Sequence, residues 1–209
     1  MANDSLAPVT GVNIVIEGAD DVATGAQAVE PHALGRTQTE LSQYIPRAAI
    51  VDHDLQRRVE AFLFTQSARL DAKDWQGYIE CFNANGVYWM PAELGQTDWE
   101  LEPSIFAEDI LMMEIRMGRL RHPNAWSQAP LWGTNHIIGN VIIEAVSADV
   151  IEVYSRFQMM ELRRDTVRHF GGTYRHTLVE HDASFRIDLQ RVDMMNGQAA
   201  YDYVLQAWV

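Results

Sequence analysis

The alternation of apolar and polar positions predicts a helix at the start of the folded region. From residue 52 onward, large side chains recur at intervals of three and four, which is the spacing of one helix face. Asp52 stands just before them and is a suitable N-cap. We therefore expect an amphipathic helix beginning near Val51. The stripe that faces the core consists of Leu55, Val59, Phe62, Leu63, Gln66 and Leu70.

Two further helices are expected before the chain changes its period. Asp74 can cap a short one, and residues 109–120 carry the next. Their apolar positions are Trp75, Tyr78, Ile79 and Phe82 in the first, and Ile110, Met113, Met117 and Leu120 in the second. Asn85-Gly86 predicts a turn, and residues 87–90 a strand that Pro91 ends. A polar loop and a short strand at Ile105-Phe106 complete this half.

The second half of the chain predicts strands. Four segments have strand-like composition and partial alternation, and short polar connections join them, which favours an antiparallel meander. They are residues 134–146, 150–163, 167–180 and 184–194. Helices followed by strands indicate an α+β fold, with N-terminal helices packed on one face of a curved, largely antiparallel sheet. Strands this long must twist and coil, so the sheet is expected to form a cone that the helices close.

The chain divides by composition into two parts. Residues 1–49 are rich in Ala, Gly, Val, Asp and Thr and have little periodicity, so they resemble a flexible N-terminal arm. Residues 50–209 form the predicted domain, which suits a length of 209 residues.

Charge excludes two classes of partner. The formal net charge is -13, and an acidic surface repels both nucleic acid and anionic membrane. No apolar run reaches the roughly 18 residues that span a bilayer, and no basic leader precedes an apolar segment. The expected location is the cytoplasm.

Cysteine content limits the metal chemistry. A Rieske cluster needs two Cys and two His ligands, whereas this chain has one cysteine, Cys81, which we expect to be buried. The nearest approach to an iron site is His176, His181 and Asp182, with Glu180 beside them. Side chains five positions apart on a strand point to opposite faces, roughly 16 Å apart along it. We therefore interpret these residues as exposed polar groups at a strand end and predict no cofactor in this chain.

Two interpretations that use the interior of the cone remain open. Tyr88, Asp109 and His136 are candidates for the acid, base and orienting group of a stand-alone dehydratase or isomerase. Their spacing carries no specific signal, and a lone histidine is more often a hydrogen-bonded structural residue. The other interpretation is a binding module that holds a small ligand in the cone. Nucleotide-binding glycine motifs are absent, and Gly171-Gly172 inside a strand predicts a bulge or bend.

The tryptophans point either to an interface or to a plug of the cone. Trp89 is expected in the core. Trp99, Trp126 and Trp132 lie in or beside predicted loops, where aromatic side chains favour protein interfaces. The sequence leaves both roles open.

Several short motifs occur in an order and spacing that resemble one known family. Residues 61–71 resemble its opening helix, Tyr88-Trp89-Met90-Pro91 its Y-x-M-P strand end, and residues 126–130 its W-x-x-x-P loop. Residues 134–141 are similar to T-R-H-x-x-x-N-V, with Asn135 in place of the arginine, and residues 170–175 are similar to F-x-G-x-R. The family is that of the small, or β, subunits of ring-hydroxylating Rieske-type dioxygenases, and the resemblance runs from about residue 55 to the end.

The resemblance implies a fold and a role. The fold is the cystatin-like, or nuclear-transport-factor-2-like, cone. The role is that of a non-catalytic structural subunit in aromatic compound degradation. Its partner would be a catalytic α subunit that carries the Rieske [2Fe–2S] cluster and the mononuclear iron, commonly in an α3β3 hetero-hexamer with three copies of each chain. For the subunit interface we predict Trp99, Arg119, Trp126 and Pro130, and we expect the N-terminal arm to wrap a neighbouring subunit.

Overall fold

The computed structural model describes residues 45–125, 132–195, 197, 205, 208 and 209. All of them belong to one unit, residues 36–209. The described helices are α2 (His53–Asp71), α3 (Trp75–Ile79) and α4 (Ile110–Arg121). The described strands are β1 (Phe82–Pro91), β2 (Ser104–Glu108), β3 (Trp132–Val146), β4 (Val150–Arg163), β5 (Thr166–His181) and β6 (Ser184–Met194).

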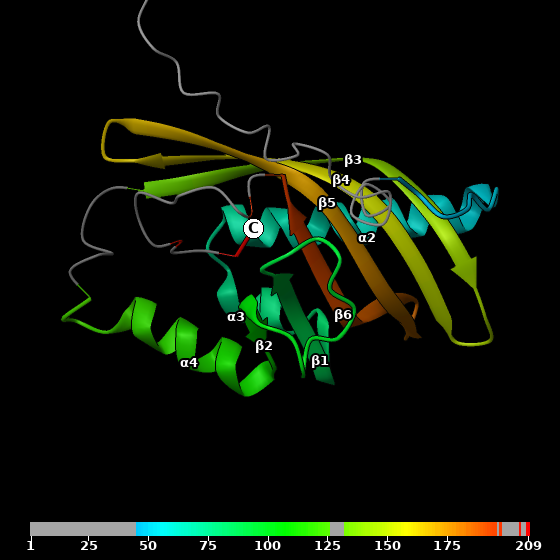
Figure 1. The fold of residues 1–209 in the computed structure, drawn as a ribbon, viewed down its shortest axis with the longest axis horizontal. Coiled ribbons are helices and arrows are strands. Elements are labelled where there is room, and N and C mark those ends of the chain that lie inside the picture. Colours follow the sequence, from blue (N-terminus) through cyan, green and yellow to red (C-terminus); the bar gives the residue numbers. More distant parts are fainter. Residues whose placement is uncertain (1–44, 126–131, 196, 198–204, 206–207) are drawn as a thin grey trace, which may run out of the picture. The chain divides into compact units, whose positions relative to one another are not determined.

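The strands form one sheet in the order β2-β1-β6-β5-β4-β3. Neighbouring strands are antiparallel except for β1 and β6, which are parallel. Helix α2 packs on β3 and β6, whereas α4 lies beside β1 and β2 (Figure 1). The α+β class and the four-strand meander predicted from the sequence are therefore confirmed.

Helix α2 follows the predicted pattern closely. The Asp52 side chain accepts hydrogen bonds from the backbone N–H groups of Asp54 and Leu55, at 3.1 and 3.0 Å, and so caps the helix. The buried residues of α2 are Val59, Leu63, Gln66 and Leu70, and Leu55 and Phe62 are partly buried. The expected stripe thus provides the contact with the sheet.

The region after α2 differs from the prediction in two details. Asp74 caps α3 as expected, but the helix ends at Ile79 and Phe82 opens β1. Asn85-Gly86 is not a turn. It lies inside β1, where the register with β6 shifts between Phe82 and Val87 and accommodates extra residues as a bulge. A Cβ atom on Gly86 would lie 2.5 Å from the carbonyl oxygen of Ile187, so the close approach of β6 explains the glycine.

Gly171-Gly172 also has a different role from the predicted bulge. The ladder between β4 and β5 passes both residues without a shift of register. A Cβ atom on Gly172 would lie 2.1 Å from the carbonyl oxygen of Asp193. The glycine therefore lets β5 and β6 approach closely.

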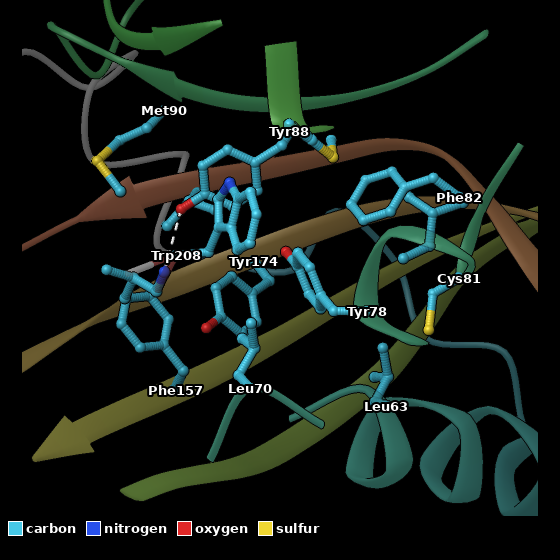
Figure 2. Packing of buried hydrophobic residues seen from close by; sticks show 14 of the residues in the cluster. Leu63, Leu70, Tyr78, Cys81, Phe82, Tyr88, Met90, Phe157, Tyr174 and Trp208 are labelled. Atoms are coloured by element: carbon cyan, nitrogen blue, oxygen red, sulfur yellow. Dashed lines mark hydrogen bonds between the residues drawn. The ribbon is translucent and has the colours of Figure 1, made fainter. Parts of the chain in front are cut away.

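Aromatic side chains fill the space between the helices and the sheet (Figure 2). Phe157 and Tyr174 stack with ring centroids 4.3 Å apart, and Trp208 packs on Tyr78 at 5.1 Å. The indole N–H of Trp208 donates to Glu108 Oε2 at 2.9 Å. The predictions that Trp89 and Cys81 are buried are confirmed.

The chain just before α2 is fixed to the sheet by ionic contacts. Glu144 on β3 accepts hydrogen bonds from the Arg47 backbone at 2.6 Å and from its guanidinium at 2.8 and 3.0 Å. Arg175 on β5 reaches both Glu144 and the carbonyl oxygen of Ile45. Residues 45–50 are therefore tied to β3 and β5. Residues 1–44, most of the predicted arm, lie outside the described residues.

Candidate functional site

A polar contact in the interior joins α2 to β3. Asp71, the last residue of α2, accepts hydrogen bonds from the His136 backbone N–H at 2.9 Å and from the Thr134 hydroxyl at 2.9 Å. The Nδ1 atom of His136 lies 2.6 Å from Asp71 Oδ1. The carboxylate therefore fixes both the backbone and the ring of His136 at the end of the helix.

The contact between Asp71 and His136 keeps the carboxylate charged and leaves one nitrogen of the histidine without a partner among the described residues. Burial alone raises the pKa of the Asp71 carboxyl, but hydrogen bonds from His136 and Thr134 outweigh burial and hold the pKa below its ordinary value. The carboxylate is therefore charged near neutral pH. The Nε2 atom of His136 is buried and has no hydrogen-bond partner among the described residues.

A second interior network links α2, α3 and β6. Gln66 Nε2 donates to Gln190 Oε1 at 2.6 Å, and the Tyr78 hydroxyl donates to the same oxygen at 3.0 Å. His176, opposite Gln190 in the sheet register, is fully buried, and burial lowers its pKa to about 3. Its imidazole is neutral at ordinary pH, so it is a core side chain and not a cation.

The structure does not bring the predicted catalytic set together. Tyr88 is buried, and its hydroxyl accepts a hydrogen bond from the backbone N–H of Val209. Asp109 is exposed and caps α4 through the backbone N–H of Met112 at 2.8 Å. His136 binds Asp71 instead. Asp109 therefore lies outside the interior that holds the other two, because it is needed at the start of a surface helix.

The interpretation of His176, His181 and Asp182 as exposed polar groups at a strand end is wrong for His176. His176 is buried, whereas His181 and Asp182 are exposed and lie 3.3 Å apart, Nδ1 to Oδ2. Within the described ranges, no group of three or more His, Cys, Asp or Glu side chains is arranged to hold a metal ion. In the same part of the chain, no helix is both long and apolar enough to cross a bilayer.

The tryptophans predicted to lie in or beside loops differ in how deeply they are buried. Trp132 is buried and stacks on Trp75 with centroids 6.0 Å apart, so it closes the interior. Trp99 is half-buried and lines a surface hollow of about 520 Å³. Arg119 is exposed on α4. Trp126 and Pro130 lie outside the described residues.

Sequence reasoning missed two features of the interior. It did not pair His136 with Asp71, because the two residues are 65 positions apart and no local pattern connects them. It also missed the C-terminal residues, because no local pattern links Trp208 to Glu108. One carboxylate oxygen of Glu108 accepts a hydrogen bond from the Trp208 indole, and the other accepts one from the Arg116 guanidinium. Glu108 therefore joins Trp208 to α4.

The fold defines an α+β protein of the nuclear-transport-factor-2-like class. The polar side chains of its interior described above form hydrogen bonds mostly with other residues of the chain. Comparison with known proteins makes the assignment more specific. The family model described as "Ring hydroxylating beta subunit" matches residues 66–198, which is more than half of the chain. The chain belongs to this family of ring-hydroxylating oxygenase β subunits.

Individual relatives agree with the family match. The chain is 29% identical over 143 residues to the small subunit of 2-halobenzoate 1,2-dioxygenase from Burkholderia cepacia, covering 66% of this chain and 87% of that protein. It is 27% identical to the small subunit of anthranilate 1,2-dioxygenase from Acinetobacter baylyi, covering 68% and 91%. Both relatives are small subunits of dioxygenases.

A solved structure supports the same assignment. The β subunit of benzoate 1,2-dioxygenase from Burkholderia mallei superposes with a TM-score of 0.57 at 26% identity, covering 69% of this chain and 93% of that one. A putative scytalone dehydratase from Novosphingobium aromaticivorans has a TM-score of 0.55 at 16% identity, covering 74% and 91%. At that identity the second likeness shows only the fold.

Proposed function

We propose that this chain is the structural, non-catalytic subunit of an aromatic-ring-hydroxylating oxygenase and holds a catalytic α subunit in an oligomer. The family match over residues 66–198 is the observation that carries this proposal. In this proposal the α subunit contains the Rieske [2Fe–2S] cluster and the mononuclear iron. The single cysteine of this chain cannot supply the two cysteine ligands of such a cluster.

The assembly follows from the same proposal. We propose an α3β3 hetero-hexamer in the cytoplasm, with Trp99, Arg119, Trp126 and Pro130 at the subunit interface. The half-buried position of Trp99 and the exposed position of Arg119 support their part in it. Of the predicted arm, residues 1–49, the last five already contact this chain's own sheet, so in this proposal residues 1–44 are the part that orders on a neighbouring subunit.

The test is a comparison of the chain alone with the chain expressed beside an α subunit. That subunit is recognised by its C-x-H and C-x-x-H motifs. The expected result is ring hydroxylation and iron in the complex only. One equivalent of tightly bound iron in the isolated chain, or hydroxylation by it, would overturn the proposal.

A further inference from the structure

Helix α4 carries apolar side chains on two faces. Met113 and Met117 are buried against β1 and β2 and the rest of the core. The opposite side, which we call the α4 outer face, consists of Leu111, Met112, Ile115 and Gly118. The first three side chains are 62%, 48% and 51% exposed. Positions 111, 115 and 118 are spaced by four and three, so they form one continuous strip.

Gly118 makes this strip unusual. A glycine inside a helix destabilises it relative to alanine. A Cβ atom placed on Gly118 would meet no other atom within 4 Å, so nothing in the described chain requires the residue to be glycine. At Gly77, Gly86 and Gly172 the chain itself fills the space, whereas Gly95, Gly133 and Gly139 are as open as Gly118 but lie outside helices. The open side of Gly118 therefore fits the close approach of another molecule.

An acidic hollow continues the α4 outer face. It has a volume of about 520 Å³, and its apolar wall includes Trp99, Ile110 and Leu111. Three carboxylate residues, Glu100, Asp109 and Glu114, line it, and none of its described lining residues is Lys or Arg. A complementary occupant has an Arg or Lys side chain next to apolar groups, since Trp99 can also stack against a cation.

The charges favour a different chain over a second copy of this one. The net charge is -13, so two copies approach each other against repulsion. In addition, every charged residue among the described lining of the hollow is a carboxylate. Trp99, predicted at the subunit interface, lines the hollow, and Arg119, predicted there too, is exposed on α4.

We infer that the α4 outer face and the adjoining hollow are the docking surface for the catalytic α subunit. The partner contributes an apolar ridge with a flanking Arg or Lys, and its backbone packs over Gly118. This inference rests on the proposed function and names the surface through which it is carried out.

The test uses the full chain, tagged and co-expressed with the α subunit that bears C-x-H and C-x-x-H. The dissociation constant of the complex is measured by mass photometry over a dilution series. Gly118→Leu and Ile115→Asp are each expected to raise it about tenfold or more. Gly118→Ala, with one added methyl group, should have a smaller effect. Ile115→Asp decides the question if Gly118→Leu does not fold by circular dichroism.

Matched controls lie on α2. Ala68 and Phe64 are exposed there, so Ala68→Leu places the same leucine side chain and Phe64→Asp the same charge away from α4. Both controls should leave the dissociation constant within about twofold of the wild-type value. Loss of binding in the controls to the same degree would overturn the inference, as would tight binding by Ile115→Asp.

The failure of this inference and the failure of the proposed function give different results. If wild-type chain does not assemble with the α subunit, the proposed function fails and the docking surface fails with it. If wild-type and α4 variants assemble equally, only the docking surface is wrong. If the isolated wild-type chain self-associates and Gly118→Leu abolishes this, the occupant is a second copy and the inference is overturned.

Discussion

Helices α2 and α4 both cover the sheet, yet their outward sides differ. The outward positions of α2 are mainly polar or small, including Asp54, Arg57, Arg58 and Ala68, although Phe64 is 48% exposed. The exposed positions of α4 include Leu111, Met112 and Ile115 beside Gly118, with Glu114 and Arg119 as the charged ones. One helix has a single apolar stripe, as a surface helix normally does, whereas the other is apolar on both sides. The difference indicates that α4 serves a partner as well as its own core.

The two sides of α4 should respond very differently to truncation. Met113 is fully buried, so Met113→Ala should destabilise the isolated chain by about 2–5 kcal/mol. Ile115→Ala should change the free energy of unfolding by less than about 0.5 kcal/mol, because the side chain is half exposed. Urea denaturation of both variants provides the measurement. Equal losses would show that α4 has no free outer face.

The interior beneath α2 predicts a pH dependence. Burial lowers the pKa of His176 to about 3, against an ordinary value of 6.5. Below pH 6.5 the unfolded chain binds a proton that the folded chain refuses, so stability falls as the pH falls. The expected slope is about 1.4 kcal/mol per pH unit between pH 6 and 4.5. Denaturant midpoints measured over this range test it.

A substitution isolates the histidine from other acid-sensitive groups. His176→Phe should flatten the slope between pH 6 and 4.5. The Asp71 and Glu144 carboxyls, whose pKa values are lowered by their hydrogen bonds, contribute stability that is lost as the pH falls below their ordinary values of 3.8 and 4.5, at and beyond the acid end of this range. An unchanged slope in His176→Phe would refute the assignment.

Helices α2 and α4 both begin with an aspartate N-cap, so the same substitution can be compared in the two helices. Asp52 accepts backbone hydrogen bonds at the start of α2, and Asp109 does so at the start of α4. Each aspartate-to-alanine change should cost about 1 kcal/mol. Thermal unfolding of the two variants should show similar downward shifts, and no shift in Asp109→Ala would leave that residue available for another role.

The smallest expected effect on the isolated chain is a gain in stability. Gly118→Ala should stabilise it by at most about 1 kcal/mol, because alanine favours the helix and its methyl group meets nothing. A modest rise in melting temperature is the expected observation. A fall would mean that the chain itself requires glycine at this position.

Local pattern was enough to predict most of the fold. The α2 stripe, the caps at Asp52 and Asp74 and the strand meander depend on neighbouring residues or on short connections, which sequence periodicity reports directly. The order of motifs along residues 61–175 was also enough to find the family. The β1 bulge escaped prediction because Asn85-Gly86 has the composition of a turn, and only contact with β6 shows that the strand continues.

The site was harder to predict because its contacts are distant in sequence. Asp71 and His136 are 65 positions apart, and Trp208 and Glu108 are 100 positions apart. Asp109 could not be assigned from sequence alone, since an N-cap and a catalytic acid use the same side chain. The exposure of Leu111 and Ile115 likewise could be seen only in the structure, because leucine and isoleucine are residue types typical of a core.

The central claim is that this chain works by holding an iron-bearing partner. Native mass spectrometry of the chain co-expressed with its Rieske-type subunit tests this claim most directly. The account predicts one hetero-oligomer with both chains in equal number. When it is dissociated, iron is found on the larger subunit and not on this chain. A spectrum in which this chain remains a separate monomer, or carries the iron itself, would contradict it.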